Sequence, residues 1–345
     1  MATVAVVIPN WNGAALLPAC LAALASQTYR DYEVVVVDNG SSDASLAVLA
    51  RFPAVRVLRL ARNCGFGAAT NAGIRATDSR YVATLNNDAV PAPGWLEALV
   101  AAAEADPRVG MCASQMVFAA RPDVLNSCGI ALDRVGIAWD LLGGQPVGAD
   151  RDLVEPFGPC AGAALYRRAM LAEIGLFDER FFAYLEDVDL AWRARRRGWR
   201  CRYVPAARVL HRHSATAGEG SAWKRYLLAR NKVWLIAKNY PTPALWRWLP
   251  LIVAYDVAAL VYALVTQRDG AALRGRLAGL AGLPAVLRAR RVAEAPARPA
   301  LGQRVPARDE LAAGAPLTAG LLPPAWPWQV PARYRHLRAL QGAVG

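Results

Sequence analysis

Residues 32–43 read YEVVVVDNGSSD, a run of four valines that ends in an acid and a cluster of turn-forming residues. A continuously apolar, β-branched run of this length predicts a strand that is buried on both faces. Strands of this kind occur in parallel sheets whose two faces are covered by helices. The stretch therefore favours an α/β fold, and Asp38 marks the carboxyl end of one strand.

The sequence on either side of this strand continues the same alternation. Short apolar runs and Ala/Leu-rich helical stretches follow one another at 4–9 (VAVVIP), 14–26, 32–38, 43–51, 55–60 (VRVLRL), 67–76 and 81–88 (YVATLNND). This order predicts a parallel sheet flanked by helices. Ligands of such sheets bind at the carboxyl ends of the strands. Three of the four strands end in polar clusters, PNWNG, DNGSSD and NND, so we expect a ligand site there.

The chain has 345 residues, of which 55% are hydrophobic, so its composition predicts a globular protein. It is long enough for one large or two modest domains. The cysteines form no CxxC pair and the histidines do not cluster, so neither a zinc site nor a disulfide framework is indicated. We expect core thiols in a reducing compartment. The opening MATVAVVIPN lacks the basic segment of a secretory signal and is expected to form the first strand.

The character of the chain changes after residue 240, and we expect a catalytic domain at 1–240 and a helical, basic extension at 241–345. Residues 267–345 hold 12 Lys and Arg against 4 Asp and Glu, which indicates an anionic partner, with a lipid surface favoured over nucleic acid. The apolar run 249–266 is short for a spanning helix, and Asp256 at its centre would cost about 2.5–3.5 kcal/mol there. A helix lying in the membrane interface, flanked by Trp246, Trp248 and Arg268, and a helix buried in a bundle both remain open.

The polar clusters also suggest chemistry. Asp88, after two asparagines in LNNDAV, offers a carboxylate oxygen of the kind that a hard divalent cation prefers, although Asn and Asp also favour turns. Asp38 could accept hydrogen bonds from a ligand. Gly65 and Gly67 in RNCGFG allow close backbone approach, but no GxGxxG follows the first strand, which disfavours a dinucleotide-binding dehydrogenase.

A second charged stretch, 184–199, reads YLEDVDLAWRARRRGW. Acids before a basic last turn complement the dipole of an ordinary helix. Asp189 is interpreted as a cap or first-turn acid that begins the helix, and Arg193, one turn later, could brace it. Glu186 and Asp187 are expected just before the helix, where they are available for chemistry.

Eight segments in this order resemble family 2 glycosyltransferases, and in particular the rhamnosyltransferase-like branch that acts on cell-envelope polysaccharides. The segments are PNWNG, VVVVDNGSSD, RNCGFGAATNAGI, LNNDAV, GPCAGAALYRR, GLFDERFFAYLEDVDLAWRARRRGW, LHRHSAT and the pair RN at 230–231. The resemblance covers residues 3–240. It implies a GT-A fold, a Rossmann-like mixed sheet flanked by helices, with a nucleotide-diphosphate sugar donor, a divalent metal (Mg²⁺ or Mn²⁺) and inversion at the anomeric carbon.

The resemblance also implies roles for individual residues. Asp187 matches the catalytic base, and Glu186 would bind acceptor hydroxyls or hold the base. Asp88 matches the metal-binding acid of the Asp-x-Asp motif, with Asn86 in place of the first Asp. His211 resembles the histidine that completes metal coordination in some relatives, although a structural histidine would also fit the position. His213 has no matching role.

The remaining implied roles concern the two substrates. The residues expected to line the nucleotide-sugar pocket, with Asp38 reading a uracil or thymine imide, are Pro9, Asn10, Asn12, Asp38, Asn63, Gly65, Asn71 and Asn87. Gly162 is expected near the acceptor. Trp95 is a candidate for stacking on an acceptor sugar, and packing at the start of a helix explains it as well.

The expected activity is transfer of a sugar, with rhamnose a candidate, from a UDP- or dTDP-linked donor to a lipid-linked or polysaccharide acceptor of the cell envelope. We expect a cytoplasmic enzyme, peripheral on the inner face of the membrane. A sugar-phosphate nucleotidylyltransferase is the first alternative, but it would carry a Gly-rich, Arg- and Lys-bearing loop where PNWNGAALLPA stands. A catalytically inactive binding subunit is the second, and it predicts loss of the Glu-Asp pair or the metal acid, both of which are present.

Overall fold

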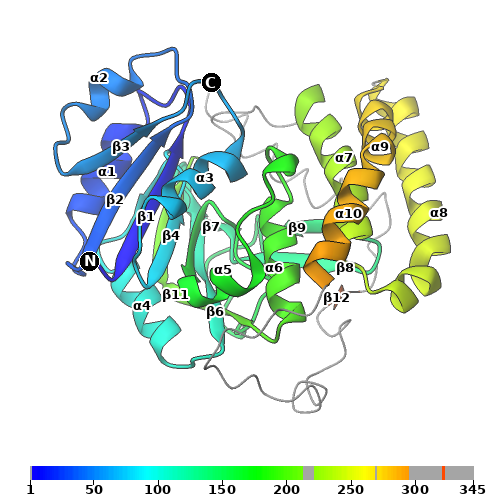
Figure 1. Ribbon diagram of the computed structural model, residues 1–345. Coiled ribbons are helices and arrows are strands. Elements are labelled where there is room, and N and C mark those ends of the chain that lie inside the picture. The colour runs from blue at the N-terminus through cyan, green and yellow to red at the C-terminus, as the bar shows by residue number, and fades with distance from the viewer. Residues whose placement is uncertain (1, 213–220, 269, 295–320, 323–345) are drawn as a thin grey trace.

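The computed structural model describes residues 2–212, 221–268, 270–294 and 321–322. Its main sheet begins with the predicted parallel strands β1 (Val4–Asn10), β2 (Tyr32–Asp38), β3 (Val55–Arg59) and β4 (Tyr81–Leu85). Strand β1 lies between β2 and β4, and β3 pairs with the other side of β2. The predicted alternation of strands and helices in the first hundred residues is confirmed (Figure 1).

The other half of the main sheet makes it mixed. Strand β10 (Ala163–Arg167) runs antiparallel between β4 and β6 (Val109–Phe118), and β11 (Arg200–His211) lies parallel to β6. The order is β3-β2-β1-β4-β10-β6-β11-β5, with β5 (Ala89–Pro91) at the edge and β7 (Arg121–Ser127) paired with β6. A small second sheet contains β8 (Ile130–Asp133), β9 (Ala138–Asp140) and β12 (Leu321–Leu322).

Helices cover both faces of the main sheet, which explains why every residue of β4 is buried. On one face, α1 (Leu17–Ala25) and α4 (Trp95–Glu104) share a core with β1 and β4, and α2 (Ser45–Leu49) joins its edge. The other face carries α3 (Phe66–Arg75), α5 (Arg168–Ile174), the short helix η1 (Glu179–Phe181), α6 (Glu186–Arg196) and α7 (Ala222–Asn239).

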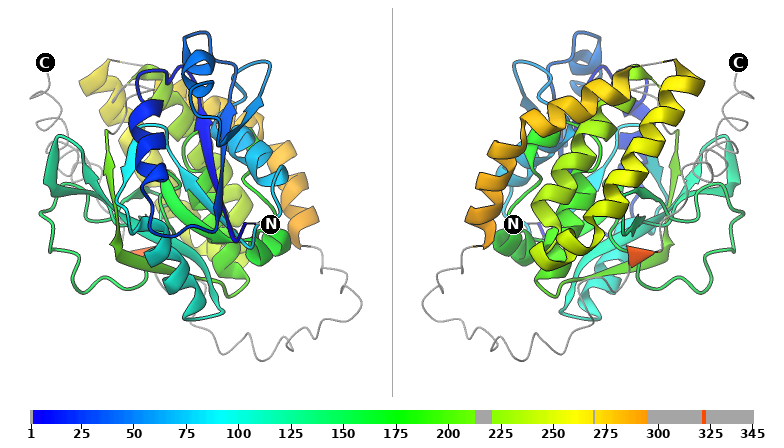
Figure 2. Two further views of the ribbon diagram at one scale, coloured as in Figure 1. Left: turned by 90° about the vertical axis from the view of Figure 1, so that its left-hand side faces the viewer. Right: turned by 90° about the vertical axis from the view of Figure 1, so that its right-hand side faces the viewer.

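Three further helices, α8 (Thr242–Gln267), α9 (Ala271–Ala281) and α10 (Leu283–Glu294), form a layer with α7 on one side of the molecule (Figure 2). The predicted domain boundary at residue 240 coincides with the junction of α7 and α8. The core is nevertheless continuous across it, because Ile252 and Tyr255 of α8 pack into the same cluster as α6 and α7.

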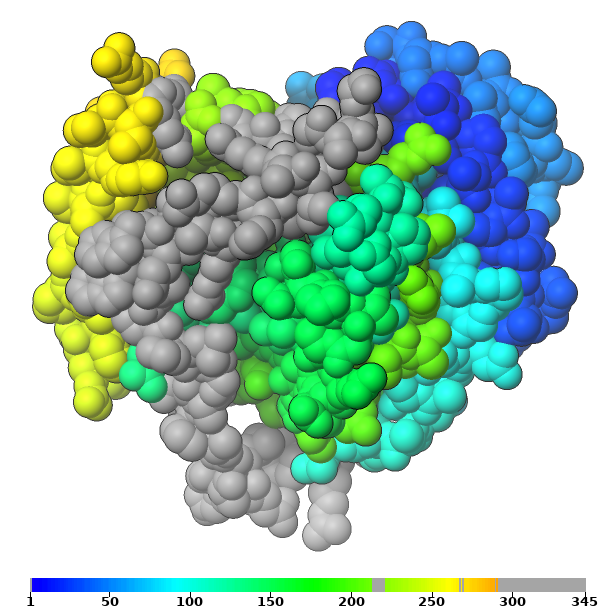
Figure 3. Space-filling view, turned by 180° about the vertical axis from the view of Figure 1, so that it is seen from behind, coloured from blue at the N-terminus to red at the C-terminus, as the bar shows by residue number. Residues whose placement is uncertain are grey.

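Helix α8 has two different faces. Asp256 turns toward the bundle, where its Oδ1 lies 2.9 Å from Lys232 Nζ and 3.0 Å from Arg276 Nη2. The opposite face exposes an apolar stripe of Trp246, Val253, Val257, Val261, Leu264 and Val265. Within the described residues, α8 alone is long and apolar enough to cross a membrane, with a mean hydropathy of 2.0 over Thr242–Thr266. In Figure 3 it forms one edge of the molecule, in yellow.

Candidate active site

The carboxyl ends of β1, β2 and β4 bring Asn10, Asp38 and Asn87 into one hydrogen-bonded chain. Asn87 Nδ2 donates to Asn10 Oδ1 at 2.8 Å, and Asn10 Nδ2 donates to Asp38 Oδ1 at 3.3 Å. Asp38 is only 2% exposed, and its second oxygen accepts the backbone N–H of Ser41 at 3.3 Å. A carboxylate offers about four lone-pair sites. Asp38 therefore retains acceptor capacity for a ligand N–H, while Pro9 lies within β1 directly before this chain.

Two loops flank the chain. Asn12 has a left-handed backbone with φ 50°, and its Oδ1 accepts the backbone N–H of Ser42 at 2.8 Å. In the other loop, Asn63 Oδ1 accepts the Gly65 N–H at 2.9 Å and the Asn39 amide at 3.0 Å. Sequence analysis did not single out Asn39, whose side chain fixes this loop to the end of β2. The nucleotide-binding roles of these residues stay predictions.

Asp88 and His211 form the candidate metal site. His211 ends β11 opposite Ala89 of β5, and its Nε2 lies 3.2 Å from Asp88 Oδ1. On the other side of the ring, Nδ1 lies 2.7 Å from Asn126 Oδ1 on β7, a contact that fits an N–H donated to the amide oxygen. In that tautomer, Nε2 turns a lone pair toward a carboxylate oxygen. A divalent cation held between the two acceptors would relieve their repulsion.

The available donor atoms fit a cation that also binds the substrate. Within the described part of the chain, no three or more His, Cys, Asp or Glu side chains group as ligands. The Asp88–His211 pair would supply one oxygen and one nitrogen, with Asn86 Nδ2 3.4 Å from His211 Nε2 beside them. Mg²⁺ is commonly bound by one or two carboxylates together with substrate phosphates and water. A diphosphate would therefore complete the coordination.

Residues 160–162 connect the metal pair to the predicted base. The Asn86 N–H donates to the Gly162 carbonyl at 2.8 Å, and a Cβ on Gly162 would lie 3.0 Å from Asn86 Nδ2. In the same loop, the Ala161 N–H donates to Asp187 Oδ2 at 3.2 Å. Loop 160–162 therefore contacts both the predicted base and Asn86, the first residue of the NND cluster that contains the predicted metal acid.

Glu186 and Asp187 are the first residues of α6, so the expectation that they precede the helix is wrong. Asp187 is partly exposed, and burial raises its pKa to about 6 even though the N–H groups of Ala161 and Val188 oppose the rise. Glu186 is 6% exposed, and its Oε2 has no hydrogen-bond partner in the described structure. Burial and the nearby Asp187 charge raise its pKa to about 8. The two raised pKa values favour a shared proton near neutral pH that is held mainly by Glu186, with the charge mainly on Asp187.

The backbone that leads into α6 is strained. Phe182, Tyr184 and Leu185 have φ of 65°, 70° and 68°, in the left-handed region that costs a non-glycine residue on the order of 1–3 kcal/mol. Asn231 of α7 stabilises this loop, because its Nδ2 lies 2.8–3.0 Å from three carbonyl oxygens within residues 181–184. The RN pair at 230–231 thus has a structural reason, since its asparagine fixes residues 181–185, which we name the catalytic loop after the candidate base that follows them.

Gly65 belongs to the loop that is expected to bind the nucleotide, and it packs against Phe182 of the catalytic loop. Its φ is +90°, and a Cβ there would lie 2.3 Å from the Phe182 carbonyl oxygen. The next residue, Phe66, donates its N–H to the same oxygen at 2.6 Å. The close approach that the sequence predicts at Gly65 is therefore made to the protein's own catalytic loop, which joins the two halves of the site.

Asp189 lies in the first turn of α6, as one of its two predicted roles requires, and it does not cap the helix. It is 0% exposed, and its carboxylate accepts hydrogen bonds from Arg193 Nε at 2.9 Å, Lys238 Nζ at 2.8 Å and Asn239 Nδ2 at 2.8 Å. The predicted brace by Arg193 is confirmed. The other partners lie 49 and 50 residues away on α7, so the local charge pattern could not indicate them.

The structure argues against two predicted binding residues. Trp95 is fully buried and donates its indole N–H to Ser114 Oγ at 2.9 Å, which leaves no ring face for an acceptor sugar. Asn71 is 1% exposed, and its amide is occupied by the Phe177 backbone and by Glu179 Oε1. Both side chains pack elements together. His213 lies outside the described residues.

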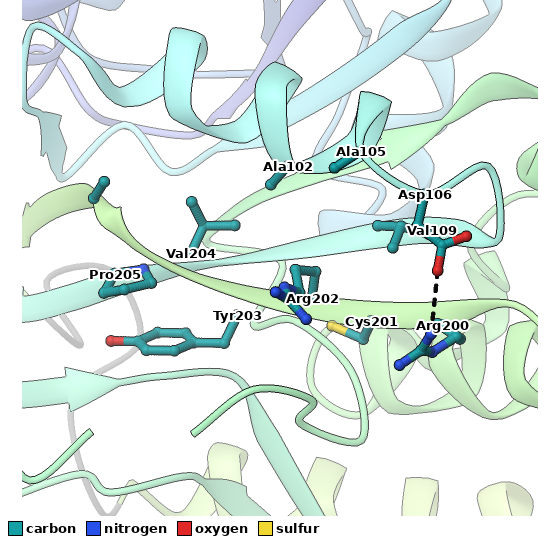
Figure 4. Close-up of a pocket in the computed structure, with 11 residues that line it drawn as sticks. Ala102, Ala105, Asp106, Val109, Arg200, Cys201, Arg202, Tyr203, Val204 and Pro205 are labelled. Atoms are coloured by element: carbon teal, nitrogen blue, oxygen red, sulfur yellow. Dashed lines mark hydrogen bonds and ion pairs between the residues drawn. The ribbon is translucent and has the colours of Figure 1, made fainter. Parts of the chain in front are cut away.

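A pocket of about 380 Å³ lies elsewhere, between α4 and β11 (Figure 4). Asp106 and Arg200 pair across its rim at 3.1 Å, and Tyr203 lines it. None of the candidate site residues lines this pocket. It therefore does not mark the donor site.

Comparison with known proteins gives the family. Residues 5–175 match Glycosyl transferase family 2, a range that includes Asp38 and Asp88 and ends before Glu186. An N-acetylglucosaminyl-diphospho-decaprenol L-rhamnosyltransferase of Mycobacterium tuberculosis is 32% identical over 237 residues, which cover 61% of this chain and 76% of that protein. The chain belongs to glycosyl transferase family 2. It is accordingly a glycosyltransferase.

Two further likenesses agree with this family. A pre-mycofactocin glycosyltransferase of Mycobacterium tuberculosis is 31% identical over 301 residues, 85% of this chain and 57% of that protein. The mannosyltransferase PcManGT of Pyrobaculum calidifontis, solved in complex with GDP-Man and Mn²⁺, is 22% identical with a TM-score of 0.52, over 99% of this chain and 86% of its own. The likeness to the mannosyltransferase structure shows that this family 2 enzyme has a GT-A fold.

Proposed function

We propose that this family 2 glycosyltransferase is an inverting, metal-dependent enzyme that moves a sugar, with rhamnose the leading candidate, from a nucleotide-diphosphate donor to a lipid-linked or polysaccharide acceptor. One observation carries the proposal: loop 160–162 bonds both to Asp187, through the Ala161 N–H, and to the backbone of Asn86, two residues before the Asp88 that pairs with His211. The arrangement supplies a base for the acceptor and a cation site for the leaving diphosphate side by side.

In the proposed reaction, Asp187 takes the proton of the acceptor hydroxyl as the hydroxyl oxygen bonds to the anomeric carbon. The bond between that carbon and the diphosphate oxygen breaks on the opposite face, so the configuration inverts. Asp88 and His211 would hold a divalent cation, which supplies positive charge to the departing diphosphate. One ionised carboxylate suffices, unlike the two-carboxylate arrangement of glycoside hydrolysis.

The choice of sugar and the choice of nucleotide are each supported by one observation. The rhamnosyltransferase relative favours rhamnose and a diphosphate-linked lipid acceptor. Asp38, at the end of β2 beside Asn10, fits a carboxylate that reads the imide of uracil or thymine, which favours a UDP- or dTDP-linked donor. The intact Glu186–Asp187 and Asp88–His211 pairs disfavour an inactive family member.

A donor screen tests the proposal. The full-length protein is incubated with UDP-, dTDP- and GDP-linked sugars, Mg²⁺ or Mn²⁺ and a candidate acceptor, and release of the free nucleoside diphosphate is measured. We expect release with one donor class, and loss of release when the metal is chelated. Asp88→Asn should lower release about 100-fold or more, since the cation stabilises charge by several kcal/mol. Release by this variant at the wild-type rate would refute the metal role.

We further propose that the exposed stripe of α8 lies on an anionic membrane surface. Five large apolar side chains along the helix are at least 40% exposed: Val253, Val257, Leu264, Val265 and, at the same face, Val261. Exposed arginines flank the stripe at 247 and 268. The acid of this helix, Asp256, pairs inward and leaves no negative charge on the stripe. Apolar contact and basic flanks together are typical of interfacial helices.

Replacing two valines of the stripe should release the protein from membranes. The double variant Val257→Asp with Val261→Asp should bind phosphatidylglycerol-containing vesicles at least about tenfold more weakly, because it removes two buried apolar contacts and adds charge. Co-sedimentation measures the effect. The control Val147→Asp, at an exposed valine of the catalytic domain, should bind as the wild type does. Equal sedimentation of all three proteins would contradict the membrane role of α8.

A further inference from the structure

A second pocket lies where the first turns of α7 and α9 meet. It has a volume of about 350 Å³ and is lined by Ala222, Trp223, Tyr226 and Arg274, and we name it the α7–α9 pocket. Trp223 is 54% exposed and stacks on Tyr226 with a centroid distance of 5.4 Å and an interplanar angle of 12°. Among the described residues, no hydrogen bond or ion pair engages the Arg274 guanidinium. The pocket thus offers a flat aromatic surface and one available cation.

The aromatic side of the pocket contacts the catalytic loop. The Trp223 ring packs edge-on against Phe182 at 6.2 Å, and Lys224 Nζ lies 5.4 Å from the centre of the Tyr184 ring. Both partners belong to the strained segment that leads into Glu186 and Asp187. The pocket is therefore in contact, through Trp223, with the loop that leads to the candidate base.

The basic side of the pocket adjoins the apolar surface of the C-terminal helices. On α9, the neighbours of Arg274 along the helix, Leu273 and Leu277, are 36% and 56% exposed. The opposite side of α9 packs tightly on α7, since a Cβ on Gly275 would lie 2.3 Å from the Tyr226 carbonyl oxygen. Arg274 therefore lies at the boundary between an aromatic pocket and an exposed apolar strip.

We propose that the α7–α9 pocket binds the head group of a diphosphate-linked lipid acceptor, with the diphosphate on Arg274, the sugar on Trp223 and the lipid chain along Leu273 and Leu277. This assignment rests on the proposed function. The side chains follow one another in the same order as the parts of such a molecule. The apolar strip fits the lipid chain, the cation fits the diphosphate, and the aromatic ring beside the catalytic loop fits the sugar. Arginine pairs with phosphate oxygens in a bidentate geometry, and aromatic faces stack on flat ligand surfaces.

The proposal also explains why the protein would need α8 and α9 beside its catalytic half. An acceptor that stays in the membrane brings its sugar only a short way above the lipid surface. With the stripe of α8 and the leucines of α9 on that surface, the pocket would open at the level of the head groups. The sugar would then pass over Trp223 toward Glu186 without the chain leaving the lipid.

Binding of two matched probes tests the assignment. Farnesyl diphosphate and farnesyl-diphosphate-linked N-acetylglucosamine are titrated calorimetrically into the full-length protein in detergent micelles, with the donor site filled by excess nucleoside diphosphate and Mg²⁺. We expect Arg274→Gln to weaken both probes about tenfold, as loss of a charge-assisted hydrogen bond does. Trp223→Ala should weaken only the sugar-bearing probe, also about tenfold, by analogy with aromatic stacking. Arg51→Gln and Val154→Ala, at exposed positions outside the pocket and outside the α8 stripe, are the controls.

The outcomes separate the pocket from the wider function. Unchanged binding in both pocket variants would overturn the assignment, even if the donor screen shows transfer. Selective loss in the pocket variants would support it, even if no donor is found. Inorganic diphosphate and farnesol serve as further ligands. If inorganic diphosphate binds as tightly as farnesyl diphosphate and depends equally on Arg274, the pocket takes a soluble anion and the lipid assignment is wrong.

Discussion

Replacing Asp187 with Asn should lower sugar transfer by about 10³–10⁴-fold, near the upper range for loss of a general base. Asn has nearly the shape of Asp but cannot take the hydroxyl proton. Initial rates of nucleoside diphosphate release, with the donor and acceptor from the screen, measure the loss. Nucleotide affinity should stay the same, because Asp187 contacts the 160–162 loop and not the Asp38 chain.

The neighbouring acid provides a matched control. Burial and the Asp187 charge raise the pKa of Glu186 to about 8, which favours its neutral form at neutral pH. Glu186→Gln replaces one neutral group with another and should retain transfer to within about tenfold. If Glu186→Gln abolishes transfer while Asp187→Asn does not, the two roles are exchanged. Wild-type turnover in Asp187→Asn would refute the base assignment.

The pH profile follows from the same two acids. Burial raises the pKa of Asp187 to about 6, and a base acts only when it is ionised. Transfer should therefore be low at pH 5, rise through about pH 6 and level off near pH 7. Ionisation of Glu186 above about pH 8 places a second negative charge beside the base. The rate of transfer should therefore depend on pH a second time, near pH 8. Asp187→Asn should lack the rise near pH 6.

The sheet and most of the candidate site follow from local sequence, because strands and their polar ends are encoded by neighbouring residues. The valines before Asp38 predict a buried strand, and the NND cluster predicts a polar strand end, both correctly placed. The antiparallel insertion of β10 between β4 and β6 could not be predicted in this way. It depends on pairing between segments that are distant in the chain, and the Gly- and Pro-rich region 100–180 carries little periodicity.

The residues whose structural role the sequence did not reveal act through such distant contacts. Asn126 orients His211 from another strand, Asn231 fixes the catalytic loop from α7, and Asn39 fixes the loop at 63–65. Each is an asparagine, a residue that is also common in turns, so composition gives no signal. For Trp95, one of the two predicted roles is wrong. An aromatic residue near a predicted cleft suggested sugar stacking, while its position on the inner face of α4 places it in the core.

Replacing Asp189 with Ala should destabilise the protein by about 3–5 kcal/mol, the usual cost of removing one partner from a buried ion pair. The carboxylate is 0% exposed, and its loss would leave Arg193 without an acidic partner and Lys238 with Asp178 alone, at 2.7 Å. Chemical denaturation measures the free energy of unfolding. The control Asp123→Ala removes an exposed ion pair with Arg121 and should leave the free energy of unfolding nearly unchanged, because solvent screens such a pair. Equal effects of the two substitutions would contradict a structural role for the buried network.

The same network predicts how acid acts on the fold. Burial alone would raise the pKa of Asp189, but the charges of Lys238 and Arg193 outweigh it and lower the pKa below its value of 3.8. A lowered folded-state pKa stabilises the protein above the unfolded-state pKa, and this stabilisation is lost as the pH falls through the folded value. Wild-type stability should therefore decline below about pH 4, with a smaller decline in Asp189→Asn. Transfer cannot report this change, because Asp187 is already protonated at such a pH; the free energy of unfolding measured against pH is the test.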